Sequence, residues 1–215
     1  MKRVFGVVEV VFDAVYLTTA FIIGITLIFT GTGNTARLTA GVMALVLAGG
    51  DAFHLVPRMK VIVSKNEEPL RKALGRGKQI TSITMTVFYL FLWQTGLLAF
   101  GLKSTEFLGY AVYILAAVRV LLCLLPQNKW LERSPVRWGI WRNIPFFLLG
   151  AVVAGLFFLH RHAVYGLGLM WLAIALSFAF YLPVVLWSNQ NPKIGMLMLP
   201  KTCAYIWMLV MCLSL

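Results

Sequence analysis

Hydrophobic and polar residues alternate along this chain in long blocks. Seven mainly apolar stretches are each close to the length of about 20 residues that a membrane-spanning helix needs. They cover residues 4–30, 37–57, 80–101, 107–126, 143–160, 164–187 and 195–215, and the fifth is the shortest. The longest polar segment between them, 58–79, has only 22 residues. The pattern predicts an all-α fold, with residues 1–215 forming a single bundle of seven transmembrane helices.

Composition agrees with this prediction. The chain is 60% hydrophobic and only 12% charged, with a mean hydropathy of +0.86, whereas soluble domains contain roughly 25% charged residues. The first apolar stretch is too long for a signal peptide and contains Glu9 and Asp13, so we expect it to remain as a helix. Cys123, Cys203 and Cys212 lie in apolar segments without CxxC spacing, which predicts neither a disulfide framework nor a zinc site. We expect a multi-pass protein of the plasma membrane.

The net charge of +12 is distributed unevenly over the polar segments. One alternating set carries Lys2, Arg3, Arg58, Lys60, Lys65, Arg71, Lys72, Arg76, Lys78, Lys129, Arg133, Arg137, Arg142, Lys193 and Lys201, and the other set only Arg37, Lys103 and Arg161. Because cytoplasmic loops are rich in Lys and Arg, this predicts a cytoplasmic N-terminus and an outer C-terminus. The expected partners of these loops are anionic lipid headgroups, which attract such segments by about 1 kcal/mol per cation. Nucleic acid is not an expected partner.

Several ionisable residues lie inside the apolar stretches, where a functional role is the first hypothesis. With the predicted topology and a helix rise of about 1.5 Å per residue, they all fall within roughly 14 Å of the cytoplasmic surface. Glu9 and Asp13 share one helix face at spacing i, i+4, and Asp51, His54 and Arg58 share another at i, i+3, i+7. Arg119 and Lys201 belong to the same layer. The sequence therefore predicts one polar pocket on the cytoplasmic side.

Two chemistries suit this layer. Glu9, Asp13, Asp51 and His54 could together bind a divalent metal that activates water, since carboxylates and imidazole are suitable ligands. Alternatively, Asp51, His54 and Asp13 could act as general acid and base without a metal. In either case we expect the cations Arg119, Lys201 and Arg58 to bind an anionic head group of the substrate. A simpler interpretation is that Asp51 and Arg119 form a structural ion pair.

A short segment resembles a known family of membrane enzymes. The residues Gly50-Asp51-Ala52, Leu55 and Pro57-Arg58, at the predicted cytoplasmic end of an early helix, resemble the Gly-Asp segment of the lysoplasmalogenase-like polytopic membrane hydrolases. The resemblance implies hydrolysis of the vinyl ether bond of a lysoplasmalogen, with Asp51 as one catalytic aspartate. That family has a second aspartate in a late helix, where residues 177–181 of this chain contain none. Asp13 or Glu9 would then supply the second carboxylate.

These observations leave three functional hypotheses. The first is a hydrolase of a lysophospholipid-like or other amphiphilic substrate. The alternative is a transporter of a small anionic or amphiphilic solute, proton-coupled through Asp13 or Asp51. The third is a non-catalytic scaffold, which predicts direct contact between Asp51 and Arg119. The outer halves of the predicted helices are almost wholly apolar, which favours a one-sided pocket and hence the hydrolase.

Overall fold

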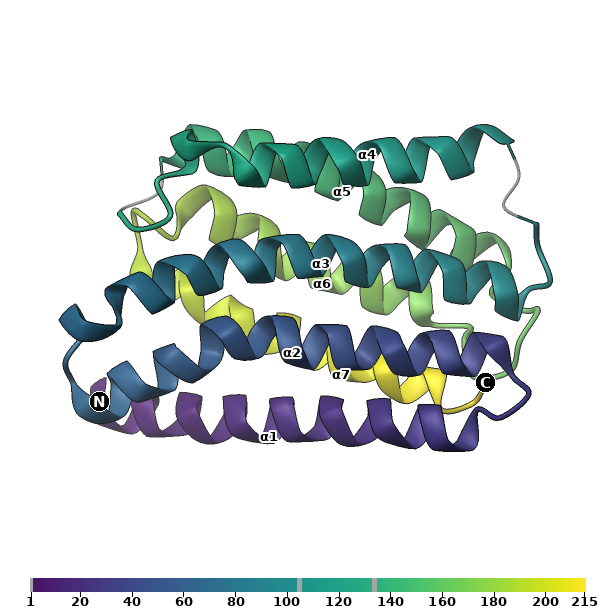
Figure 1. The fold of residues 1–215 in the computed structure, drawn as a ribbon, viewed down its shortest axis with the longest axis horizontal. Coiled ribbons are helices and arrows are strands. Elements are labelled where there is room, and N and C mark those ends of the chain that lie inside the picture. The colour runs from purple at the N-terminus through teal and green to yellow at the C-terminus, as the bar shows by residue number, and fades with distance from the viewer. Residues whose placement is uncertain (1, 104–105, 133–134) are drawn as a thin grey trace.

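In the computed structural model the chain is a bundle of seven α-helices running back and forth along one axis (Figure 1). The structure describes residues 2–103, 106–132 and 135–215, so Arg133 lies outside the described residues. The helices are α1 (Lys2–Thr30), α2 (Thr35–Ser64), α3 (Arg71–Ala99), α4 (Glu106–Leu124), α5 (Val136–Leu159), α6 (Met170–Trp187) and α7 (Met198–Cys212). Short 3-10 helices cover Glu68–Leu70 (η1), Pro126–Asn128 (η2) and Pro192–Leu197 (η3).

The helices α1 to α4 follow one another across the front of the bundle in Figure 1, and α5 to α7 return behind them. In the part of the chain that is described, six helices are long and apolar enough to cross a membrane. The remaining helix, α4, is apolar over the shorter segment Leu108–Leu124. The prediction of an all-α, multi-pass type of chain is therefore confirmed, and the direction of insertion stays a prediction.

Some predicted helix boundaries were wrong, because hydropathy locates apolar segments rather than helix ends. The helix α2 continues through Pro57 to Ser64, and α3 begins at Arg71, so most of the expected polar loop 58–79 is helical. The helix α5 begins at Val136 and has 24 residues, so it is not the shortest. The predicted start of the sixth helix fails because Gly166 adopts a φ of +90° in a turn before Met170.

The closest packing joins α2 and α3. A Cβ atom on Gly50 would lie 2.1 Å from Oγ1 of Thr84, and one on Gly77 would lie 2.3 Å from the carbonyl oxygen of Phe53. Pro57 has no N–H with which to satisfy that Phe53 carbonyl in the helix. The Gly50 carbonyl, in turn, accepts a hydrogen bond of 2.8 Å from the Thr81 hydroxyl. Gly50 and Gly77 therefore let the backbones of α2 and α3 approach closely next to Asp51 and His54.

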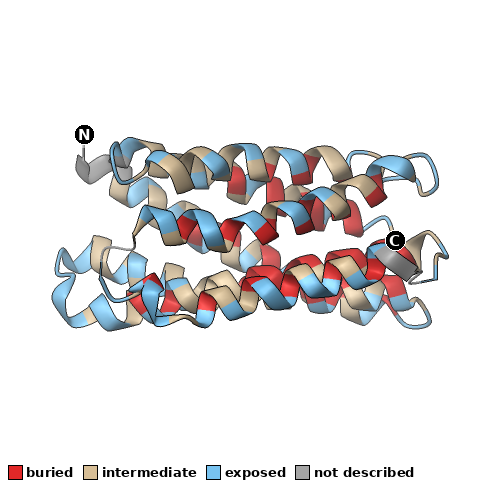
Figure 2. Cartoon of the chain, turned by 90° about the horizontal axis from the view of Figure 1, so that it is seen from above, coloured by how far each residue is buried: buried red, intermediate tan, exposed pale blue. Residues whose placement is uncertain are grey.

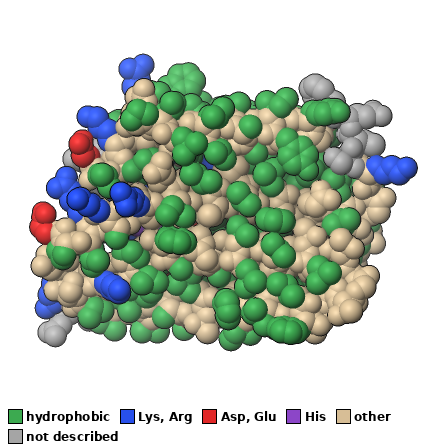
Figure 3. Space-filling view, in the orientation of Figure 1, with side chains coloured by type: hydrophobic (Ala, Val, Ile, Leu, Met, Phe, Trp, Pro, Cys, Tyr) green, Lys and Arg blue, Asp and Glu red, His purple; other side chains and the backbone are tan. Residues whose placement is uncertain are grey.

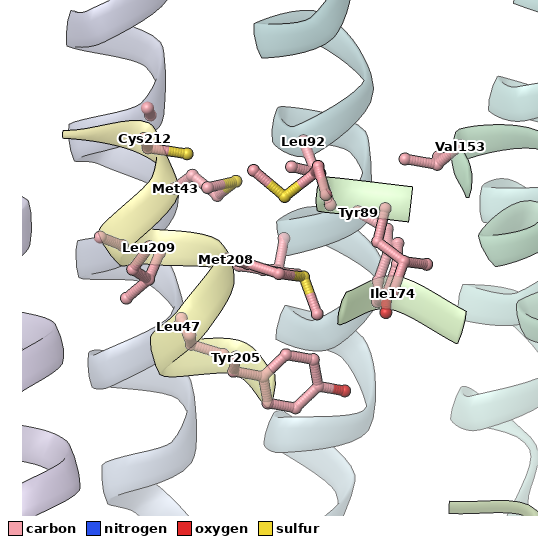
Figure 4. Close-up of a cluster of buried hydrophobic side chains, with 14 of the residues drawn as sticks. Met43, Leu47, Tyr89, Leu92, Val153, Ile174, Tyr205, Met208, Leu209 and Cys212 are labelled. Atoms are coloured by element: carbon pink, nitrogen blue, oxygen red, sulfur yellow. The ribbon is translucent and has the colours of Figure 1, made fainter. Parts of the chain in front are cut away.

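The two ends of the bundle differ. Lys and Arg side chains gather where the N-terminus and the α2–α3 and α4–α5 connections lie, and we call this the basic end (Figures 1 and 3). Buried residues are more frequent toward the opposite end (Figure 2). There Met43 and Leu47 of α2 pack with Met208 and Leu209 of α7 in the apolar core (Figure 4). The opposite end is consequently closed by packed side chains, whereas the buried charged residues Asp13, Arg119 and Lys201 lie toward the basic end.

Candidate functional site

A cavity of about 690 Å³ occupies the basic end of the bundle. All seven helices contribute to its lining, which includes every residue that the sequence suggested for a site: Glu9, Asp13, Asp51, His54, Arg58, Arg119 and Lys201. The structure thus brings these residues, which are spread over 193 positions of the chain, to one space. Its volume is within the range of about 300–1,000 Å³ that is usual for ligand pockets.

The acidic wall of the cavity belongs to α1 and α2. The Tyr16 hydroxyl donates a hydrogen bond of 2.7 Å to Oδ2 of Asp51, which orients that carboxylate. Asp13 is only 5% exposed, and its Oδ2 atom is buried without a hydrogen-bond partner among the described residues. It lies close enough to Asp51 to interact with its charge. The wall therefore holds one carboxylate in a fixed orientation and a second with a free oxygen.

Glu9 and His54 take different positions. Glu9 forms an ion pair and hydrogen bond with Arg58 at the partly exposed edge of the cavity. His54 lies at the α2–α3 contact with its Nδ1 atom buried and unpartnered among the described residues. The imidazole is close enough to Arg58 and Lys78 to interact with their charges. The ion-pair contact of Arg58 is thus with Glu9, through its Nε atom.

The basic wall is centred on Arg119 of α4, which is only 2% exposed. Its Nε atom donates a hydrogen bond of 2.9 Å to Thr86, and Nη1 donates one of 3.0 Å to Asn143. The guanidinium carbon lies 3.5 Å from the centre of the Phe146 ring. All these partners are uncharged, so the geometry orients the guanidinium without neutralising it.

Lys201 of α7 is the second buried cation, at 7% exposure. Its ammonium lies 4.1 Å from the centre of the Tyr181 ring and 5.2 Å from that of Tyr205. It is close enough to Asp51 and Arg119 to interact with their charges. Neither of the two ion pairs within the described residues includes Lys201. The cavity therefore contains two buried cations that lack a carboxylate in direct contact.

The predicted ion pair between Asp51 and Arg119 is not formed. Asp51 accepts its hydrogen bond from Tyr16, and the guanidinium of Arg119 is occupied by groups of α3 and α5. The contact that the scaffold hypothesis required is thus absent. A buried charge without an opposite partner in direct contact is costly, so the uncharged contacts of Arg119 leave part of that cost uncompensated.

The proposed metal ligands do not assemble. Across residues 2–103, 106–132 and 135–215, no three His, Cys, Asp or Glu side chains come close enough together to hold a metal ion. Glu9 pairs with Arg58, and Asp51 accepts a hydrogen bond from Tyr16. Asp13 and His54 alone provide too few ligands for a metal ion. The predicted set Glu9, Asp13, Asp51 and His54 therefore does not assemble into a metal site in the part of the chain that is described.

The sequence did not predict that uncharged residues orient the site. The spacing i, i+4, i+7 places Tyr16 on the helix face of Glu9 and Asp13, but it predicts no hydrogen bond to Asp51. Asn143 is a lone amide in an apolar helix, where it accepts hydrogen bonds from Arg119 and from Tyr181, the latter of 3.2 Å. The pairing of α4 with α5 through this amide has no signal in the sequence.

Comparison with known proteins adds no assignment. The chain matches no protein-family model, no curated protein and no solved structure. The function is therefore argued from the cavity itself.

Proposed function

We propose that this chain is a seven-helix integral membrane protein that binds an anionic amphiphile in its cavity and hydrolyses it. The observation that carries the proposal is the presence of Arg119 and Lys201, buried and without carboxylate contacts, in the same cavity as Asp51 and Asp13. The proposed orientation places the basic end in the cytoplasm, in agreement with the positive-inside rule.

The two cations are the proposed binding site for the head group. A phosphate or carboxylate between Arg119 and Lys201 would supply the direct anionic contact that neither cation has in the protein, through charge-assisted hydrogen bonds. Apolar lining residues, including Phe146, Val184 and Leu199, suit the hydrocarbon part of the same molecule. Arg58 of the predicted substrate-binding set is left out, because Glu9 already pairs with it.

The two aspartates are the proposed catalytic groups. Asp51, oriented by Tyr16, accepts one proton from a water molecule as the water oxygen bonds to the substrate carbon. Asp13, in its protonated form, donates a proton to the leaving oxygen as the old bond breaks. One water is consumed, and proton exchange with solvent returns both carboxyl groups to their starting states. His54 is proposed to hold the α2–α3 side of the site through its position beside Gly77.

A transporter would need a continuous path to the opposite end. Met43, Leu47, Met208 and Leu209 fill that region with fully buried apolar side chains (Figure 4). This packing favours a site without a path to the opposite end, which is compatible with hydrolysis but not with transport across the bundle.

The test is the variant Asp51→Asn, assayed as purified protein against ester- and vinyl-ether-linked lysophospholipids in mixed micelles. We expect turnover to fall by about 10²-fold or more, the usual contribution of a general base. Glu67→Gln, on the exposed α2–α3 connection, is the matched control and should turn over as the unchanged protein does. Turnover that survives Asp51→Asn, or an unchanged protein that cleaves no lysophospholipid in the panel, would contradict the proposal.

A further inference from the structure

The helix α7 is fastened to α2 at the end opposite the cavity. Asn34 donates a hydrogen bond of 2.8 Å from its side-chain nitrogen to the Leu215 carbonyl, and Arg37 donates one of 2.8 Å to the Leu213 carbonyl. Below these bonds the side chains of α2 and α7 interlock in the apolar core (Figure 4). These contacts hold α7 against α2 at this end, and α7 also packs along α6.

At the basic end the cavity separates α7 from α1. Val8, Glu9 and Asp13 of α1 and Met198, Lys201 and Thr202 of α7 all line the cavity. The two helices thus face each other across the space that holds the aspartates and the cations.

The rim between these two helices is apolar and open to the outside of the bundle. Val8 and Met198 both line the cavity, yet they are 54% and 38% exposed. A side chain that borders the cavity and is also largely exposed marks an edge of its mouth. At the end of the bundle, the exposed cavity residues include the charged Arg58 and Lys78 as well as the apolar Val136 and Met196. The cavity therefore has a mouth at the basic end that carries charged residues, and an apolar mouth on its side.

We propose that the ligand enters sideways between α1 and α7, and that its hydrocarbon chain remains in this apolar mouth while its anionic head reaches Arg119 and Lys201. The inference rests on the proposed binding of an anionic amphiphile. It identifies the ligand class as a lipid with one chain and an anionic head, drawn from the leaflet on the basic side. A water-soluble anion would instead use the charged mouth.

The arrangement of apolar and charged residues around the cavity supports entry between α1 and α7. Met198 lies about one helical turn before Lys201, and both line the cavity together with Asp13 and Asp51, so a bond next to the head group would come to rest near the carboxylates. A lipid chain that lies along Val8 and Met198 stays in an apolar environment, so its move from the bilayer costs little free energy. The charged head, in contrast, gains direct contact with buried cations. Entry from the side also keeps the chain out of water throughout binding.

The test narrows the apolar mouth with the double variant Val8→Trp/Met198→Trp, in protein reconstituted into lipid nanodiscs. The matched control is Val11→Trp/Val210→Trp, which changes exposed residues of the same two helices that are not among the cavity-lining residues. The probes are a 16-carbon lysophosphatidate and glycerol 3-phosphate, which has the same head without a chain. Binding of each probe is measured by equilibrium titration and by competition.

We expect the mouth variant to weaken lysophosphatidate binding by about tenfold or more, the factor for displacing two methylenes from apolar contact. Glycerol 3-phosphate binding should be unchanged, and the control should bind both probes normally. Equal lysophosphatidate affinity in the mouth variant and the control would overturn sideways entry, as would an equal loss for both probes. If the unchanged protein binds neither probe, the proposed function itself fails.

Discussion

Gly49 and Gly50 are neighbours on α2, but only Gly50 faces α3. A Cβ atom on Gly50 would lie 2.1 Å from Oγ1 and 2.5 Å from Cβ of Thr84, whereas nothing lies within 4 Å of a Cβ atom on Gly49. Rotation of the Thr84 side chain cannot relieve the contact with its own Cβ atom. The substitution Gly50→Ala must therefore push α2 and α3 apart, next to Asp51.

The expected magnitude follows from two opposed effects. Replacing glycine by alanine inside a helix is favourable by about 0.5–1 kcal/mol. Overpacking a close contact costs about 1–3 kcal/mol. Since the first effect is common to both positions, Gly50→Ala should be less stable than Gly49→Ala by about 1–3 kcal/mol.

The measurement is reversible unfolding of both variants in mixed micelles, followed by helical circular dichroism as a denaturing detergent is added. Gly49→Ala should match or exceed the unchanged protein in free energy of unfolding. Equal free energies for the two variants would refute the close α2–α3 approach and, with it, the stated positions of Asp51 and His54.

Three further substitutions test other contacts. Tyr16→Phe removes the hydrogen bond to Asp51. We expect the free energy of unfolding to fall by about 1–3 kcal/mol and turnover to fall as well. Turnover at the original rate would argue against an oriented carboxylate. Glu9→Gln breaks the partly exposed ion pair with Arg58. Because solvent screens such pairs, the free energy of unfolding should change by less than about 1 kcal/mol. A larger loss in the unfolding titration would show that the pair is more isolated from solvent than its exposure indicates. Asn34→Ala removes both the N-cap of α2 and the hydrogen bond to the Leu215 carbonyl, and the free energy of unfolding should fall by about 1–3 kcal/mol. An unfolding curve that overlays that of the unchanged protein would contradict the attachment of α7 to α2 through Asn34.

The sequence predicted the helices well, because long apolar blocks and charged loops follow directly from the chemistry of a membrane. It predicted helix ends poorly. At Pro57 the expected end was wrong, since the helix continues past a residue that cannot donate to the Phe53 carbonyl. The Phe53 carbonyl that Pro57 leaves without its helical donor lies against Gly77 of α3, and this contact between segments could not be predicted from the local sequence.

Depth along the helices was sufficient to predict which ionisable residues would share a cavity, but not how they would pair. Opposite charges at equal depth suggested that Asp51 would meet Arg119. The observed hydrogen bonds depend instead on the rotation of each helix, which turns Asp51 toward Tyr16 and Arg119 toward Thr86 and Asn143. Rotation is set by packing among all the helices, so it could not be predicted from any one of them.

The hydrogen-bond partners of Arg119 also affect the order in which helices can insert into the membrane during synthesis. Arg119 lies five residues before the end of α4, and an unpaired arginine inside an apolar helix opposes membrane insertion by up to about 2.5–3.5 kcal/mol, the figure for the helix centre. In the proposed topology α3, with Thr86, is synthesised before α4, but Asn143 of α5 emerges only afterwards. The helix α4 consequently depends on a helix that the ribosome has not yet completed. Stable insertion of α4 should therefore await α5, so that these two helices enter the membrane as a hairpin.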